Sequence, residues 1–527
     1  MTAVAAQRKK IGVWTCAALV VGNMIGSGIF LLPSALAAFG AISIVGWIVT
    51  AAGAMLVALV FARLSRMVPR AGGPYAYARH GFGEFAGFLI AWGYWISILC
   101  GNAAIAVALV SYLSVFVPPL AENGALAGAT AVAAIWMLSL VNSRGVFAAG
   151  RVQVVTTVLK LIPLVVLGTL GFAWFEPDNL VPFNVSGGSN YSAITATAAL
   201  TLWAFLGLES ATVPADDVRN PQRTIPRATV LGTAVAAIVY IAATAAVMGI
   251  VAPASLAGSE APFADAASRI WGGWAGYAVA AGAVVSCFGA LNGWILNAGQ
   301  IPLAAARDGL FPRPFARVTP RGAPGFSLIV SAALVTLLVA TNYTRGLVGL
   351  FTFAILLSTL TALVPYAFSA MAELMIFMKE REQFVGERLA GASIIAVVAF
   401  AYSLWAIAGA GQEIVFWGFL LLLSGLPVYV WITWRRGADE RLSARRGRPG
   451  GGATAEYEPE GADEQTGKLR AEALERRIDS EQIDARERDE SGREKARFLQ
   501  SGDTLSGEDY RERDHENAVG AEELPER

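Results

Sequence analysis

The feature that most constrains this chain is a succession of apolar stretches, each about as long as the 20 or so residues that a helix needs to cross a bilayer. Polar or Gly/Pro-containing connections separate them. The first stretch is too long for the apolar part of a signal peptide, so we expect it to remain as the first helix. The predicted spans are 12–37, 42–66, 84–115, 125–143, 150–174, 193–215, 227–251, 271–305, 325–342, 346–376, 389–410 and 414–434. The sequence therefore predicts an all-α polytopic membrane protein of about twelve transmembrane helices.

Charge is distributed unevenly along the chain, although 40 basic and 40 acidic residues balance overall. Residues 1–436 hold 24 Lys and Arg against 15 Asp and Glu, whereas residues 437–527 hold 16 against 25. The second region is rich in charge and poor in aromatic side chains, a composition that does not support a packed core. We therefore expect a transmembrane domain over 1–436 and a charged, mostly disordered cytoplasmic tail over 437–527.

The connections between the predicted spans carry a strong Lys and Arg asymmetry. With the N-terminus in the cytoplasm, 21 Lys and Arg residues in or beside the connections lie on the cytoplasmic side, and only Arg269 and Arg345 lie on the opposite side. The positive-inside rule depends on this bias in short loops. We therefore predict a multi-pass protein of the cell inner membrane with both termini in the cytoplasm.

The first predicted span contains a run of small residues, G-N-M-I-G-S-G-I-F over 22–30. Each glycine in a helix interior costs about 1 kcal/mol relative to alanine, so Gly26, Ser27 and Gly28 predict a local unwinding. In a bilayer, unwound backbone is tolerated only where protein or a water-filled cavity satisfies its N–H and C=O groups, which is typical of a substrate site. Close helix packing through small residues is the alternative interpretation.

The sixth predicted span carries a matching interruption, L-W-A-F-L-G-L-E-S over 202–210, with Gly207 and the carboxylate of Glu209 near its middle. Interruptions five helices apart are what an inverted five-helix repeat predicts, in which two broken helices meet near the middle of the membrane. The expected fold is therefore a 5+5 inverted-repeat core, with helices 1 and 6 unwound, plus two extra helices. Half-helix ends of this kind suit a small zwitterionic or charged ligand.

Further segments, taken with these two interruptions, resemble a known family. They are G-G-P-Y-A-Y-A-R over 72–79, N-P-Q-R-T-I-P-R over 220–227, Gly293 and Trp294 followed by A-G-Q over 298–300, and D-G-L-F-P over 308–312. Together they resemble the amino acid, polyamine and organocation permease superfamily, and most of all its bacterial arginine:agmatine antiporter branch with its lysine:cadaverine relatives. The resemblance covers residues 8–436. It implies a secondary active transporter of amino acids or amines that works by alternating access, with a homodimer as an expected assembly.

The resemblance also implies a substrate site at the two interruptions. The first would bind a carboxylate through backbone N–H groups and a hydroxyl, because a helix N-terminus attracts anions. The second would offer backbone carbonyl oxygens to the α-amino group. The implied substrate-binding residues are Ile25, Gly26, Ser27, Gly28, Asn102, Ile105, Trp203, Ala204, Phe205, Gly207, Trp294 and Ser358.

Several of these residues have a more specific role by resemblance. Trp203 would close over the substrate, and the ring of Trp294 would stack on a cationic side chain with about 0.5 to 2 kcal/mol. Packing is the alternative for both rings. Ile105 stands where the antiporters have a methionine, so selectivity for the side chain is left open. The implied gating residues are Asn23, Tyr75, Tyr94, Trp203, Glu209 and Tyr366.

Two ionisable residues, Glu209 and Lys160, lie within predicted spans. An ionisable side chain in a membrane is costly unless it is paired or hydrated, which makes both candidates for proton or cation coupling. The arginine:agmatine antiporter has a small apolar residue in place of Lys160. In proton-coupled branches of the superfamily, a lysine at this place contacts the unwound helix 1 and substitutes for a sodium ion. A structural cation or a side chain reaching toward the interface is the alternative for Lys160.

Three functions remain open from the sequence. The leading one is amino acid transport, as a basic amino acid/amine exchanger. The second is proton-coupled symport of neutral amino acids through Lys160, and the third is a transporter-like sensor or scaffold acting through the tail. We find no pore loop for a channel, no nucleophile with a base or carboxylate pair for an enzyme, and no ATP motif for a pump. No catalytic residue, metal, cofactor or nucleic-acid partner is expected, only a small substrate and the lipid bilayer.

Overall fold

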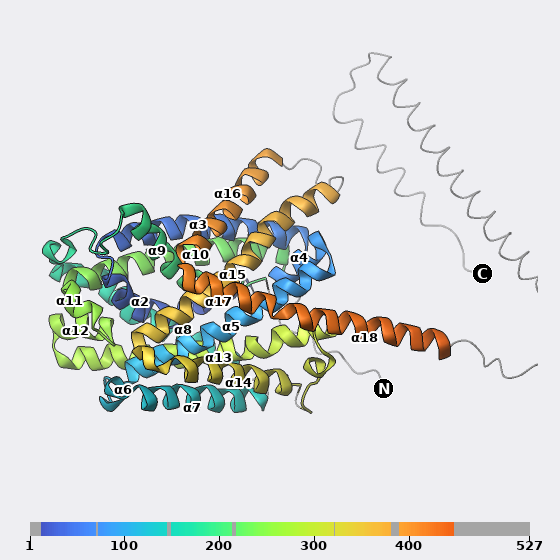
Figure 1. Cartoon of the computed structure of the whole chain (residues 1–527). Coiled ribbons are helices and arrows are strands. Elements are labelled where there is room, and N and C mark those ends of the chain that lie inside the picture. The colour runs from blue at the N-terminus through green and yellow to red at the C-terminus, as the bar shows by residue number, and fades with distance from the viewer. Residues whose placement is uncertain are drawn as a thin grey trace, which may run out of the picture. The chain divides into compact units, whose positions relative to one another are not determined.

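The computed structural model describes residues 12–69, 72–144, 149–212, 218–320, 322–380 and 389–446 (Figure 1). The chain divides into two units, Met1–Ser443 and Ala444–Arg527, and the description that follows concerns the first. Most of the predicted tail, from residue 447 onward, lies outside the described residues.

The described residues form helices and no strands. Short helical turns and loops join the long helices. The helices are α1 (Val13–Met24), α2 (Gly28–Ala37), α3 (Ile42–Met67), α4 (Pro74–Phe82), α5 (Glu84–Leu113), α6 (Pro119–Glu122), α7 (Gly124–Ser143), α8 (Ala149–Leu170), α9 (Asn190–Leu202), α10 (Pro221–Ile250), α11 (Pro253–Ala257), α12 (Pro262–Trp271), α13 (Gly273–Arg307), α14 (Gly325–Asn342), α15 (Gly346–Lys379), α16 (Leu389–Gly409), α17 (Gln412–Leu423) and α18 (Gly425–Arg446).

Helices occupy every one of the predicted spans within the described residues, which confirms the all-α membrane fold. By length and apolar composition alone, 8 segments of this part of the chain could cross a bilayer. One of the 8 joins α14 and α15, and Lys160–Trp174 and Ser393–Gly409 are shorter apolar helices. The last helix differs from the prediction, because α18 runs on to Arg446 instead of ending at 434. Its extra residues include good helix formers, and in the sequence Asp439 and Glu440 follow Arg435 and Arg436 by four residues, a spacing that favours continuation.

The outward faces of the peripheral helices are apolar. Leu140 on α7, Ile238 on α10, Leu337 on α14 and Phe419 on α17 have exposed fractions of 55%, 69%, 60% and 58%. In water, such continuous apolar surface would promote association. On a membrane protein it is the surface that contacts the lipid chains, since those chains are as apolar as the side chains themselves.

The interior is organised around α5, most of whose residues are buried. It packs against α13 and α15, while α10 packs against α3 and α1, and α3 packs against α9. Figure 1 shows α7, α13 and α14 running along one side of this bundle. Small residues permit some of the closest contacts: a Cβ on Gly46 of α3 would lie 2.1 Å from the hydroxyl of Thr197 on α9. The bundle is therefore close-packed around its central helix.

Both predicted interruptions are present. The first span consists of α1 and α2, with residues 25–27 unwound between them. In the sixth span, α9 ends at Leu202, a short 3-10 turn, η4, follows over Trp203–Phe205, and turns continue to residue 212. Gly207 has φ +105, a backbone conformation that favours glycine. The two breaks adjoin each other, since the backbone of Asn23 lies 3.2 Å from the Cβ position of Gly207.

Candidate functional site

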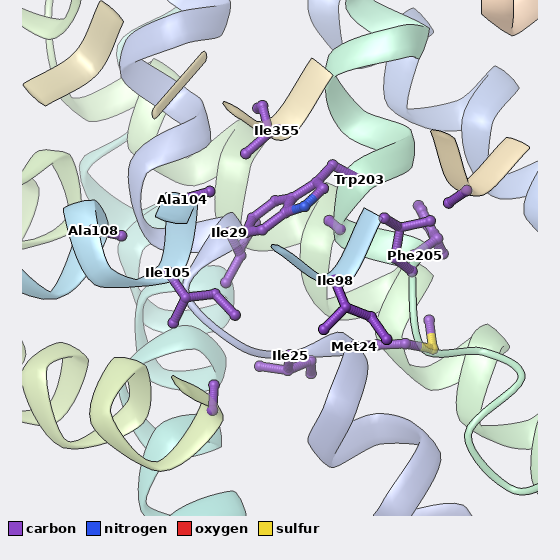
Figure 2. Close-up of a cluster of buried hydrophobic side chains, with 14 of the residues drawn as sticks. Met24, Ile25, Ile29, Ile98, Ala104, Ile105, Ala108, Trp203, Phe205 and Ile355 are labelled. Carbon is purple, nitrogen blue, oxygen red and sulfur yellow. The ribbon is translucent and has the colours of Figure 1, made fainter. Parts of the chain in front are cut away.

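A small cavity lies at the two breaks. Its walls come from the first broken helix, the sixth broken helix, α5, α13 and α15. Figure 2 shows the apolar side of this region, with Met24, Ile98, Ile105 and Trp203 in one cluster. The lining residues are Asn23, Met24, Gly26, Ser27, Gly28, Tyr94, Ser97, Ile98, Gly101, Ile105, Trp203, Leu206, Trp294, Ser358 and Ala362.

At the first break, the polar backbone is satisfied from two neighbouring helices. The buried Lys160 of α8 donates from Nζ to the carbonyl of Gly22 at 2.5 Å. The hydroxyl of Ser286 on α13 donates to the carbonyl of Gly26 at 3.2 Å. An α-helix leaves its first N–H groups without partners in the helix, and those of α2 begin at the cavity. The carbonyls of Gly22 and Gly26 thus have donors from other helices, and the first turn of α2 lies beside the cavity.

Ser27 and Gly28 form the corner at which α2 begins. The Ser27 hydroxyl is fully buried, and no hydrogen-bond partner reaches it within the described residues. A Cβ on Gly28 would lie 2.3 Å from the ring of Trp203, so only glycine leaves room for that ring. Gly28 therefore brings the first turn of α2 and the Trp203 ring together at the cavity.

At the sixth-helix break, three successive backbone carbonyls have hydrogen-bond donors. The hydroxyl of Tyr240 on α10 donates to the carbonyl of Ala204 at 3.0 Å. The carbonyls of Trp203 and Phe205 accept bonds from the N–H groups of residues 206 and 208 at 3.1 and 3.3 Å. Leu206 lines the cavity, and none of the hydrogen bonds in this segment of the described chain reaches its carbonyl.

Glu209 connects this break to two long helices. Tyr94 of α5 donates to its Oε1 at 2.6 Å, and Tyr366 of α15 donates to its Oε2 at 2.6 Å. The N–H of Gly207 also donates to Oε2, at 3.1 Å. The carboxylate is fully buried, and these three donors supply the polar contacts that a buried charge requires. Glu209 therefore fixes the position of the sixth-helix break relative to α5 and α15.

Comparison with known proteins identifies the family. A family model described as "Amino acid permease" matches residues 11–432. This chain belongs to that family. The permease is 38% identical over 372 residues to the cadaverine/lysine antiporter of Escherichia coli K12, covering 69% of this chain and 83% of that protein. It is 33% identical over 431 residues to the putrescine transporter PotE of Haemophilus influenzae, covering 82% and 98%. The family and these relatives are transporters, so the permease is a transporter and not an enzyme.

The permease brings many of the predicted substrate residues together at the cavity. Gly26, Ser27, Gly28, Ile105, Trp203, Trp294 and Ser358 line it. Others lie behind this lining: Asn102 donates to the Trp294 carbonyl at 3.4 Å, and Ala204 accepts from Tyr240. Ile25, Phe205 and Gly207 also lie outside the lining.

The predicted gating residues lie in three places. Asn23, Tyr94 and Trp203 line the cavity, and Trp203 also makes an edge-to-face contact with Phe351, with centroids 5.5 Å apart. Glu209 and Tyr366 lie directly behind Tyr94, joined by the hydrogen bonds described above. Tyr75 lies outside the cavity lining, on α4, and its hydroxyl donates to Asp308 at 3.2 Å. Burial, followed by the nearby Asp308 carboxylate, raises the pKa of Tyr75, so the hydroxyl remains a neutral donor.

Six cavity residues were not predicted, and one signal in the sequence points to several of them. Tyr94, Ser97, Ile98, Gly101 and Ile105 follow the 3.6-residue period of one face of α5. Two predicted residues on that helix therefore indicated the others. Ser97 and Ser358 donate to each other's carbonyls, at 2.9 and 2.8 Å, which joins α5 to α15 at the cavity wall. The remaining residues are Met24, Leu206 and Ala362. Their positions at the cavity depend on the way in which the broken helices meet, which the sequence does not reveal.

Proposed function

We propose that this permease exchanges a basic amino acid for an amine across the bacterial inner membrane, with both bound in the cavity at the two breaks. The observation that carries the proposal is the opposite polarity of the two breaks at one cavity. The relatives named for lysine, cadaverine and putrescine support the choice of cationic substrates.

The main chain recognises the part that all α-amino acids share. The substrate carboxylate lies at the N-terminus of α2, where N–H groups and the helix dipole favour an anion. The Ser27 hydroxyl, which has no partner in the described residues, donates to the same carboxylate. The α-amino group donates to backbone carbonyls of the sixth-helix break, among which that of the cavity residue Leu206 has no hydrogen bond within the described residues. This arrangement holds the zwitterion without selecting a side chain.

Side-chain selectivity comes from the wall formed by α5, α13 and α15. Trp294 offers an aromatic face to a cation, and Ser97 and Ser358 add hydroxyl groups beside it. Asn102 holds the backbone at Trp294 and so orients that ring. In the part of the chain that the structure describes, no Asp, Glu, Lys or Arg is among the lining residues. Recognition of a cationic side chain therefore relies on the Trp294 ring and on polar neutral groups.

Access to the cavity alternates through the residues that surround it. Trp203 closes over the substrate, since its ring packs against Gly28 at the break of the first helix. Tyr94, Glu209 and Tyr366 form a second barrier, because their hydrogen bonds join the sixth-helix break to α5 and α15. Asn23 and Tyr75 belong to the cytoplasmic path. Movement of the broken helices relative to the others would break these contacts in turn.

Lys160 favours a second candidate function, proton-coupled uptake of neutral amino acids. Its ammonium group is fully buried and donates to the Gly22 carbonyl at the break, so loss of its proton would alter the break directly. The lack of charged side chains among the described lining residues also suits a neutral substrate. In an exchanger, the same lysine serves as a fixed cation that stabilises the unwound backbone.

The organisation around the transport site is also part of the proposal. The Lys and Arg bias of the connections places both termini in the cytoplasm. Residues 1–436 form the transporter domain, and 437–527 form a cytoplasmic tail that could also act as a sensor or scaffold. A homodimer is the proposed assembly. Deletion of the tail tests its role, because unchanged uptake would make it dispensable for transport.

Uptake into proteoliposomes tests the function. Labelled lysine, arginine and leucine would be supplied outside, with cadaverine, agmatine or no amine inside, and with or without a proton gradient. Exchange predicts lysine or arginine uptake only into amine-loaded vesicles. Gradient-driven leucine uptake into empty vesicles would instead support the proton-coupled function. Trp294→Leu should weaken the cationic substrates by about 2- to 30-fold and spare leucine.

A further inference from the structure

Tyr240, on α10, lies outside the cavity lining and yet contacts the backbone of the sixth-helix break. The side chain is fully buried, and its hydroxyl donates to the Ala204 carbonyl at 3.0 Å. Ala204 sits in η4, between Trp203 and Phe205. The contact therefore reaches the part of the broken helix directly beside a cavity residue.

The ring of Tyr240 is held in place by two other aromatic rings. It makes an edge-to-face contact with Phe205, with centroids 5.5 Å apart and planes at 86°. It also packs against Trp47 of α3, with centroids 5.3 Å apart and planes at 40°. Aromatic pairs at these distances stabilise each other beyond their area of contact. The Tyr240 hydroxyl is thus presented to Ala204 from a rigid cluster.

The direction of the Ala204 carbonyl has a consequence for its neighbours. A peptide group is planar, so fixing one carbonyl also fixes the orientation of the next N–H and limits the adjoining residues. Trp203 and Leu206, which flank this part of the chain, both line the cavity. The Ala204 carbonyl is bound to Tyr240, and those of Trp203 and Phe205 are bound to backbone N–H groups. Within the described residues, the Leu206 carbonyl is the one in this turn, 203–206, without a hydrogen bond.

We propose that Tyr240 is a positioning residue for substrate recognition: by holding the Ala204 carbonyl away from the cavity, it sets the Leu206 carbonyl as the acceptor for the substrate α-amino group. Tyr240 does not touch the substrate and acts through the backbone of the break. The inference rests on the proposed site for an α-amino acid. It doesn't depend on which amino acid is transported, because all of them carry the same α-amino group.

The test is Tyr240→Phe, which keeps the ring and removes only the hydroxyl. Tyr112→Phe is the matched control, because the buried Tyr112 also donates to a helix carbonyl, that of Phe30 at 2.6 Å, away from the cavity lining. Both variants lose buried hydrogen bonds and should lose some thermal stability, Tyr112→Phe the more so because its hydroxyl also accepts from the N–H of Phe263 at 3.3 Å. Only Tyr240→Phe should raise the KM for the transported amino acid, by about tenfold, with the maximal rate within about twofold.

A substrate analogue makes the readout specific to the α-amino group. 6-Aminohexanoate is lysine without that group, and its inhibition of uptake measures binding without the Leu206 contact. In wild type, lysine should bind more tightly than 6-aminohexanoate, and Tyr240→Phe should reduce that preference by about tenfold. An unchanged preference and KM in Tyr240→Phe, with stability lowered as in Tyr112→Phe, would mean that Tyr240 is only structural.

Failure of the proposed function would look different. If wild type transports leucine and not lysine, the exchanger is wrong, but the Tyr240 test proceeds with leucine against its analogue that lacks the amino group. A raised KM and a lost preference would still support positioning by Tyr240. Their absence in that assay would overturn it.

Discussion

The two helix breaks satisfy their unwound backbone groups by different means. In the first, only three residues separate α1 from α2, and its carbonyls are held by side chains of other helices, Lys160 and Ser286. In the sixth, the irregular segment is longer, and its own carboxylate, Glu209, holds the N–H of Gly207. The first break therefore depends on donors from outside, whereas the second carries part of its support in its own sequence.

This difference matches the polarity that each break offers to the cavity. Donors that occupy the carbonyls of the first break leave N–H groups for an anion. In the second break, the Leu206 carbonyl has no hydrogen bond within the described residues, which leaves it for a cation in the proposed site. In the proposed site, the supporting residues would determine which end of a zwitterion each break receives, and substitutions at them test the comparison.

The largest effect is expected for Lys160→Ala, at the first break. It leaves the Gly22 carbonyl buried without its donor and opens space in a packed region, at about 1–3 kcal/mol for the carbonyl alone. We expect uptake to fall at least about 100-fold, because the break also loses its only described cation. Lys379→Ala is the control, since Lys379 donates to the carbonyl of Gly81 at 2.8 Å at a part-buried helix end. Equal losses in the two variants would contradict a special role for Lys160.

A smaller but still large effect is expected for Glu209→Gln, at the second break. The carboxylate accepts from Tyr94, Tyr366 and Gly207, whereas an amide has one acceptor oxygen and introduces two donors. At least one of the three donors then loses its acceptor, and we expect uptake to fall about 10- to 100-fold. Thermal unfolding and uptake would both be measured, with Glu413→Gln in the exposed pair with Arg345 as the control. Wild-type uptake by Glu209→Gln would show that the tyrosine contacts are dispensable.

The positions of both breaks could be predicted from the sequence, because glycine and an ionisable residue inside an apolar stretch have a local cost that is visible without the fold. Their support could be predicted only in part. Lys160 is conspicuous in an apolar span, but Ser286 and Tyr240 resemble ordinary residues of a membrane helix. Their roles depend on which helix packs beside which break, and that is a property of the tertiary structure.

An intermediate effect is expected for Gly28→Ala, which tests the contact between the breaks. The added Cβ would lie 2.3 and 2.6 Å from two ring carbons of Trp203, so the ring must move out of its place over the first break. Overpacking of this kind costs about 1–3 kcal/mol, and we expect substrate affinity to fall about tenfold. Gly12→Ala is the control, because no atom lies within 4 Å of its Cβ position. Unchanged binding of labelled substrate to Gly28→Ala would mean that the position of the Trp203 ring does not matter for closing over the substrate.

The smallest effect on transport, and the sharpest test of polarity, is expected for Ser27→Ala. The Ser27 hydroxyl is buried without a partner in the described residues, so its removal should leave the substrate-free protein as stable as wild type or slightly more so. Substrate affinity should nevertheless fall about fivefold, because the carboxylate loses one hydrogen bond.

Ser286→Ala should show the reverse pattern to Ser27→Ala, since its hydroxyl already serves the Gly26 carbonyl. Its removal should lower thermal stability, with a smaller change in affinity, in the same detergent-solubilised protein. Unfolding curves with and without substrate measure both quantities at once, because a ligand raises the unfolding temperature according to its affinity. If Ser27→Ala lost stability and kept its affinity, the hydroxyl would serve the protein and not the substrate. The first break would then bind the carboxylate through its backbone N–H groups alone.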